Sequence, residues 1–100
     1  MSDDEITLLK ELLIDNARFH ELALIAFRDQ AGFEDSLRNP SSLTKAVNSI
    51  CLQANIPSFE LTNDESEELF IKGMNFSEFL STIRDYLKAA LQAILGASNP

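Results

Sequence analysis

Apolar residues recur every three or four positions through the first quarter of the chain, which is the spacing of an amphipathic α-helix. The main stripe consists of Ile6, Leu9, Leu13, Ala17, His20, Leu24 and Phe27. A second apolar line runs beside it, made of Leu8, Leu12, Phe19, Leu22 and Ala26. Two lines cover more surface than one buried face needs. The segment is therefore either central in the fold or in contact with another chain, and Asp15 and Asn16 offer a point where it could divide into two helices.

Start and stop signals divide the rest of the chain. The segments 2–5, 62–65 and 75–78 read Ser-Asp-Asp-Glu, Thr-Asn-Asp-Glu and Asn-Phe-Ser-Glu, and each predicts a capped helix start. Asn39 followed by Pro40 is a further start signal. Gly32, Gly73 and Gly96 stand where helices are expected to stop.

These signals predict a short helix over 33–38 with Phe33 and Leu37 on one side, and an apolar helix over 40–54. An extended connector is expected at 59–61. A short helix carrying Leu69 and Phe70 follows, with Gly73 as its left-handed stop, and a last helix over 76–95 ends at Gly96.

The predicted fold class is all-α. We expect a compact bundle of five or six helices, with long first and last helices and short capped helices between them. Residues 1–96 form a single helical domain in this interpretation, and residues 97–100 form a flexible tail.

Composition narrows the function classes. The 100 residues carry a net charge of -8, which argues against sequence-independent nucleic-acid binding and against docking on anionic lipid. The acidity favours solubility, and a basic protein partner is the alternative. No apolar run approaches the length that spans a bilayer, and the acidic N-terminus lacks the basic region of a secretory signal. A cytoplasmic location is expected.

Few residues offer chemistry. His20 is the single histidine and is expected to be a packed structural residue, with a pH-sensitive contact as the alternative. Cys51 is the single cysteine, so no internal disulfide can form, and it is expected to act as a small buried hydrophobe. The acids that begin at Asp64 do not fit a calcium loop, because Leu69 stands where glycine is needed. We expect no metal or other cofactor, and the sequence favours a chain without catalytic activity of its own.

Two surfaces are candidates for binding a protein partner. The first is the outer side of the first helix, around Leu8, Leu12 and Phe19. The second is Phe59, which follows Pro57 in a connector where a side chain can project outwards and anchor a partner.

One order of residues has a counterpart in known families. It runs from Phe33, Leu37 and Asn39-Pro40 through an apolar helix to Leu61-Thr62, Glu65, Leu69-Phe70, Gly73, Asn75 and Phe79-Leu80. About half of the chain thereby resembles the small helical chain of protocatechuate-type extradiol dioxygenases. It is also similar to the leader or recognition domains of ribosomal peptide precursors of the split borosin, nitrile-hydratase-like and nitrogen-fixation-associated kinds.

The resemblance implies a chain that works with a larger partner enzyme, which in the dioxygenases holds the iron. Only three residues, 98–100, follow the weak cleavage signal Gly96-Ala97. The leading hypothesis is a non-catalytic interaction module, which would be a recognition domain bound by a partner enzyme. The alternatives are an accessory subunit of a hetero-oligomeric enzyme and a structural homodimer.

Overall fold

The apolar stripe at the start of the chain folds into two helices. In the computed structural model, which describes residues 3–97, α1 spans Asp3–Ile14 and α2 spans Asn16–Ala31. The chain bends at Asp15, where ψ is 82° and the side chain accepts a hydrogen bond of 3.1 Å from the Arg18 amide. Because Asp15 caps the start of a new helix, the apolar stripe is divided between two helices at this residue. The division at Asp15 and Asn16, one of the two alternatives, is therefore the correct one.

The later helices begin at the capping residues. Asn39 accepts from the Ser42 amide and starts α3, Pro40–Gln53, and Thr62 and Glu65 form a complete capping box at the start of α4, Asn63–Leu69. Asn75 and Glu78 exchange the same pair of hydrogen bonds at the start of α5. Last, α5 covers Phe76–Ala97.

These elements confirm the all-α class with five α-helices among residues 3–97. The helix α5 continues through Gly96, so the expected stop at that residue is wrong by at least one position. The first predicted capping box depends on Ser2, which lies outside the described residues, as do residues 98–100 of the predicted tail.

The helix expected over 33–38 does not form. Gly32–Glu34 make a single 3₁₀ turn, and Gly32 and Asp35 have positive φ angles of 60° and 54°. Because a right-handed helix needs negative φ throughout, these two residues confine the turn. Phe33 and Leu37 consequently do not share a side, since Phe33 is exposed and Leu37 is buried.

Two further expectations were wrong. The connector expected to be extended over 59–61 begins inside a 3₁₀ turn, Pro57–Phe59, and the backbone becomes extended only at Glu60. Gly73 is not the stop of α4, which ends at Leu69, where the backbone of Phe70 becomes extended. Gly73, with φ of 72°, instead turns the chain toward α5.

Beside this turn the Leu37 amide donates to the Met74 carbonyl at 2.8 Å, which joins two loops distant in sequence.

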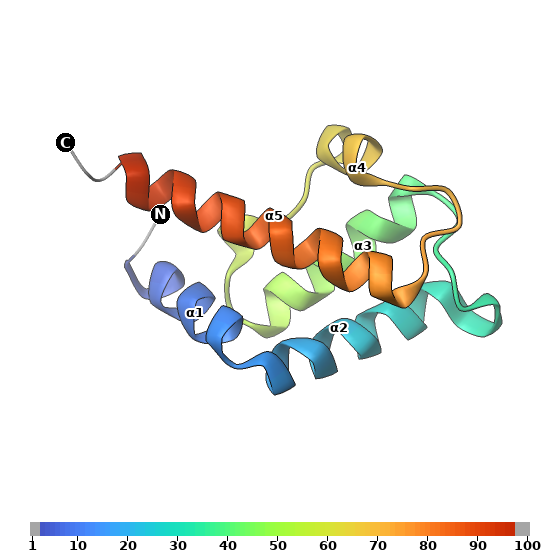
Figure 1. Cartoon of the computed structure of the whole chain (residues 1–100), viewed down its shortest axis with the longest axis horizontal. Helices are drawn as coiled ribbons and strands as arrows, with labels where there is room; N and C mark the ends of the chain where they lie inside the picture. The colour runs from blue at the N-terminus through green and yellow to red at the C-terminus, as the bar shows by residue number, and fades with distance from the viewer. Residues whose placement is uncertain (1–2, 98–100) are drawn as a thin grey trace.

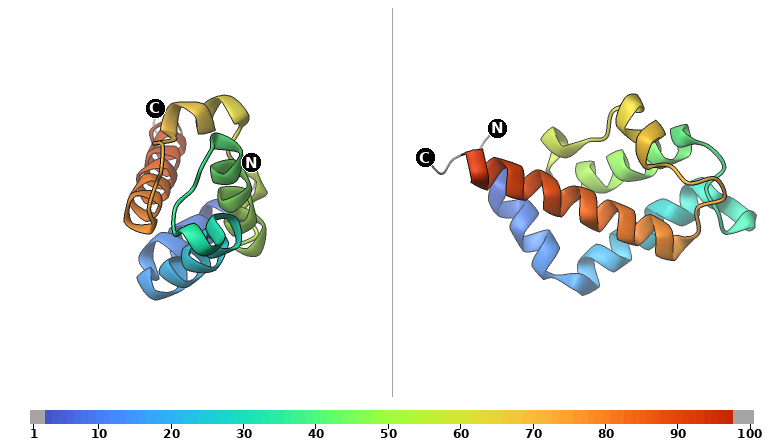
Figure 2. Two further views of the ribbon diagram at one scale, coloured as in Figure 1. Left: turned by 90° about the vertical axis from the view of Figure 1, so that its right-hand side faces the viewer. Right: turned by 45° about the horizontal axis from the view of Figure 1, so that its top comes forward.

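The helices pack around α2, which contacts α1, α3 and α5. Figure 1 shows α1 and α2 meeting at an angle, with α5 running the length of the molecule across them. In the end view of Figure 2, α3 and α5 stand side by side, α4 lies over them and α1 and α2 lie beneath. The largest fully buried side chains are Phe19, Phe79, Leu9, Leu12, Leu37, Leu43, Ile50, Ile56, Met74, Ile83, Leu87 and Val47.

Polar contacts hold the smaller elements onto this core. Asn48 of α3 accepts from the Leu61 amide at 2.8 Å, and Glu5 of α1 accepts from the Ser58 amide at 3.1 Å. Ser66 is the buried polar side chain of the described residues, and it is hydrogen-bonded to Thr44 of α3. Since a buried hydroxyl is costly unless it is bonded, this pair fixes how α4 lies on α3.

Candidate functional site

Three of the four residues expected to bind a partner lie in the core. Leu12 and Phe19 are at most 1% exposed and Phe59 is 3% exposed, while Leu8 is half-buried against the core. Most side chains of the two apolar lines are buried or half-buried, because α2 is covered by three helices. The expectation that these side chains form an outer surface is therefore wrong.

Phe59 is buried because of its local backbone. The 3₁₀ turn at Pro57–Phe59 and the bond from the Leu61 amide to Asn48 hold this segment against α3. The ring thus points inward instead of projecting from the connector. Phe59 is therefore not available as an anchor for a partner.

Cys51 behaves as the sequence predicted. Its thiol is buried on α3, and burial, followed by the nearby charge of Glu60, raises its pKa to about 12. A thiol that stays protonated at neutral pH is a poor nucleophile. We therefore assign Cys51 to the core.

His20 lies at the surface and not within the core. Its ring packs edge-on against Phe76, with the ring centroids 5.2 Å apart and an interplanar angle of 83°. His20 is thus packed on one side, as expected, while its residue remains exposed. The contact places it next to the first turn of α5.

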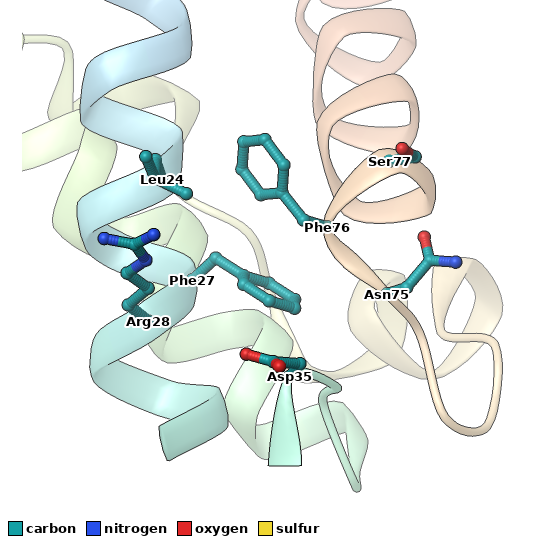
Figure 3. Close-up of a pocket in the computed structure, with 7 residues that line it drawn as sticks. All are labelled: Leu24, Phe27, Arg28, Asp35, Asn75, Phe76 and Ser77. Atoms are coloured by element: carbon teal, nitrogen blue, oxygen red, sulfur yellow. The ribbon is translucent and has the colours of Figure 1, made fainter. Parts of the chain in front are cut away.

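A hollow of about 360 Å³ opens beside this contact, between α2 and the start of α5. Figure 3 shows the rings of Phe27 and Phe76 projecting into the space between the two helices. Seven residues line it: Leu24, Phe27, Arg28, Asp35, Asn75, Phe76 and Ser77. Its volume is at the lower end of the range for sites that hold a small ligand, and so suits one side chain.

The wall of the hollow is aromatic. The ring centroids of Phe27 and Phe76 lie 5.5 Å apart at 63°, and those of Phe27 and Phe79 lie 5.4 Å apart at 46°. Phe27 and Phe79 are buried, whereas Phe76 is half-buried and keeps part of its ring open. Because Phe27 and Phe79 are buried, half-buried Phe76 is the residue on which a further aromatic ring can pack favourably.

Charges of both signs stand at the opening. Arg28 is exposed on α2 and Asp35 is exposed in the loop that follows α2. Within the described residues neither side chain has a hydrogen bond or ion pair, whereas nearby Arg38 is paired with Glu34. Arg28 and Asp35 are therefore available to groups that approach from outside.

The hollow is distinguished by its wall and not by its size. Neighbouring hollows of about 390 and 550 Å³ exist on the surface. The residues around the first are mostly polar, and the second has Ile25 as its one large aliphatic side chain. Of these three hollows, the one between α2 and α5 is the one that two phenylalanines line.

Sequence reasoning missed the most exposed apolar residue. Phe33 is 106% exposed, as open as in an extended peptide, on the turn between Gly32 and Asp35. The sequence signal for this exposure is Gly32. A glycine that ends α2 directly before Phe33 means that the ring does not continue the apolar stripe of α2. Phe33 and the hollow lie on adjoining parts of the same loop region, since Asp35 lines the hollow.

The acidic residues of α4 form a solvated face. Asp64, Glu67 and Glu68 are exposed, and Glu65 serves the capping box.

Over residues 3–97, no three His, Cys, Asp or Glu side chains are grouped as ligands for a metal ion. In the same part of the chain no helix has both the length and the apolar character needed to cross a membrane.

Comparison with known proteins found no matching family, curated protein or solved structure. The likeness to dioxygenase small chains and precursor leader domains stays a prediction from the sequence.

Proposed function

We propose that this chain is a non-catalytic protein-interaction module, and that the hollow between α2 and α5 receives an apolar side chain of its partner, preferably an aromatic one. The observation that supports this most directly is the half-buried position of Phe76 beside Phe27, with ring centroids 5.5 Å apart. A recognition domain bound by a partner enzyme, acting in the cytoplasm, is the form of this role that we favour.

The chemistry of the hollow suits recognition. Burying one aromatic side chain contributes about 1.5–3 kcal/mol, and an edge-on ring contact adds about 0.5–1.5 kcal/mol. Arg28 and Asp35 then select for neighbouring groups of opposite charge. An anchor of this kind fixes orientation, while the rest of the interface supplies most of the affinity.

The surrounding residues support binding rather than catalysis. Two groups near the hollow could transfer a proton: Asp35 lines it, and His20 contacts the Phe76 ring. The nucleophilic side chain Cys51 is buried in α3.

A small aromatic probe tests the hollow directly. We would titrate isotope-labelled protein with N-acetyl-phenylalanine amide and follow backbone amide chemical shifts by NMR. We expect shifts at 24–28, 35 and 75–78, with a dissociation constant on the order of 10 mM for so small a probe. N-acetyl-alanine amide should give no comparable shifts.

Adjacent residues of α2 provide a matched pair of variants. Leu24 lines the hollow, whereas Ile25 lines a separate hollow between α2 and α3. Leu24→Trp should fill the hollow and abolish the response, and Ile25→Trp should leave it unchanged. If both variants respond like the wild type, or if the shifts cluster elsewhere, the hollow is not the binding site.

A further inference from the structure

We propose that the partner of the hollow is a second copy of this chain, which packs its Phe33 against half-buried Phe76. This inference depends on the proposed function, because it names the source of the aromatic side chain. It predicts a two-fold symmetric dimer in which each copy gives one phenylalanine and receives one.

The first support is the way in which Phe33 is presented. The side chain is fully exposed on a 3₁₀ turn between two residues with positive φ, Gly32 and Asp35. The Gly32 amide donates to the Arg28 carbonyl, and Glu34 is paired with Arg38, so the turn is held on both sides of Phe33. Because the backbone that carries this ring is already held, only the side chain loses freedom on binding.

The second support is the position of the hollow. Asp35, two residues after Phe33, forms part of its lining. In Figure 1 the turn after α2 and the start of α5 lie at the same end of the molecule. Phe33 itself borders a different hollow, with Arg38 and Asn39. Because the anchor and the hollow that receives it are separate features at one end, a two-fold axis at that end would bring each against its counterpart in the other copy.

The third support is charge. Arg28 at the hollow has no ion pair among the described residues, and neither has Asp35, which follows Phe33 by two positions. When the partner's Phe33 enters the hollow, the Asp35 that follows it approaches Arg28. The two-fold axis repeats this pairing, so the local charges attract although each chain has a net charge of -8.

Such a dimer should be weak. Two small aromatic contacts with charged rims predict a dissociation constant of roughly 10–100 µM. Sedimentation equilibrium in ~0.15 M salt, where repulsion between the net charges is screened, should therefore show dimers that form as the concentration rises to about 1 mM. Phe33→Ala and Leu24→Trp should each weaken the dimer at least about tenfold, and Ile25→Trp should not.

Disulfide trapping locates the contact. Phe33→Cys mixed with Leu24→Cys should give a cross-linked heterodimer under mild oxidation, because only thiols brought within bonding distance can join. Phe33→Cys mixed with Ile25→Cys is the matched control and should cross-link much more slowly. The native Cys51 is buried and does not compete.

The outcomes separate this inference from the proposed function. A chain that stays monomeric at about 1 mM, or that cross-links equally at 24 and 25, overturns the dimer. If N-acetyl-phenylalanine amide still binds in the hollow of that monomer, the interaction module stands and its partner is a different protein. A dimer that Phe33→Ala leaves intact also overturns the inference, because its interface then lies elsewhere.

Discussion

The Tyr86 hydroxyl of α5 donates a hydrogen bond of 3.1 Å to one carboxylate oxygen of Glu65 in α4. The other oxygen of Glu65 accepts from the Thr62 amide at 3.0 Å and completes the capping box. A single carboxylate therefore both starts α4 and ties it to α5. Because α4 has only seven residues, this tie is important for holding it in place.

Replacing Tyr86 by phenylalanine should loosen α4. The change removes one hydrogen bond and keeps the ring, so we expect a loss of about 1 kcal/mol in the free energy of unfolding and a fall of about 4–8 °C in melting temperature. Calorimetry of the two proteins measures this. An unchanged melting temperature would show that the tie contributes nothing.

The Glu65 carboxylate makes the free energy of unfolding depend on pH in the acid range. The backbone hydrogen bond to Thr62, helped by the hydroxyls of Thr62 and Tyr86, lowers the pKa of Glu65 below its ordinary value of 4.5 despite opposing desolvation. The stabilisation is therefore present above pH 4.5 and is lost as the pH falls through the lowered pKa. Urea unfolding should show that the difference in stability between wild type and Glu65→Gln shrinks from pH 6 to pH 3. A constant difference would contradict it.

Alkali should destabilise the fold through Cys51. Burial and the charge of Glu60 raise the pKa of the thiol from 9.0 to about 12, so the protein is most stable while the thiol is protonated. Stability is fully present below pH 9 and is lost as the pH rises from 9 toward 12. Between pH 8 and pH 10 we expect a loss of about 1.4 kcal/mol, measured by urea unfolding.

Cys51→Ala is the control for this loss. It should start from a lower stability, because a buried group has been removed, but it should stay nearly level up to pH 10. Above that pH both proteins should weaken, because burial and Glu65 raise the pKa of Tyr86 from 10.0 to about 12. An equal loss in both proteins between pH 8 and pH 10 would exclude Cys51 as its source.

Phe33 and Phe59 form a matched pair for stability. Phe59→Ala empties a core position and should cost about 3–5 kcal/mol, whereas Phe33→Ala removes a side chain that touches solvent and should change stability by less than about 0.5 kcal/mol. Chemical denaturation at low protein concentration, where a dimer would dissociate, measures both. Similar costs for the two variants would contradict the burial described above.

The sequence predicted the helices through their ends. The Asn39, Thr62 and Asn75 caps rest on local chemistry within four residues, so they could be identified without knowing the fold. The bend at Asp15 was one of two alternatives, because the apolar stripe continues through it and the choice depends on how α1 and α2 pack against α5.

The site was not predictable in the same way. The hollow combines Phe27 of α2 with Phe76 of α5, which are 49 positions apart, and periodicity says nothing about such pairings. Phe33 and Phe59 were assigned in reverse, because apolar spacing ignores the positive φ of Gly32 and Asp35 and the bond from Leu61 to Asn48. The exposure of Phe33 and the burial of Phe59 depend on this backbone geometry and on tertiary contacts.

The link from the Leu37 amide to the Met74 carbonyl also gives the molecule a built-in reporter. Leu37 follows Asp35 by two positions, and Met74 directly precedes Asn75. The bond therefore joins the two loops that carry Asp35 and Asn75, which both line the hollow. Any widening between those loops must break this one bond. Deuterium exchange at the Leu37 amide would therefore record how often the hollow opens, and a ligand that holds the loops together should slow that exchange.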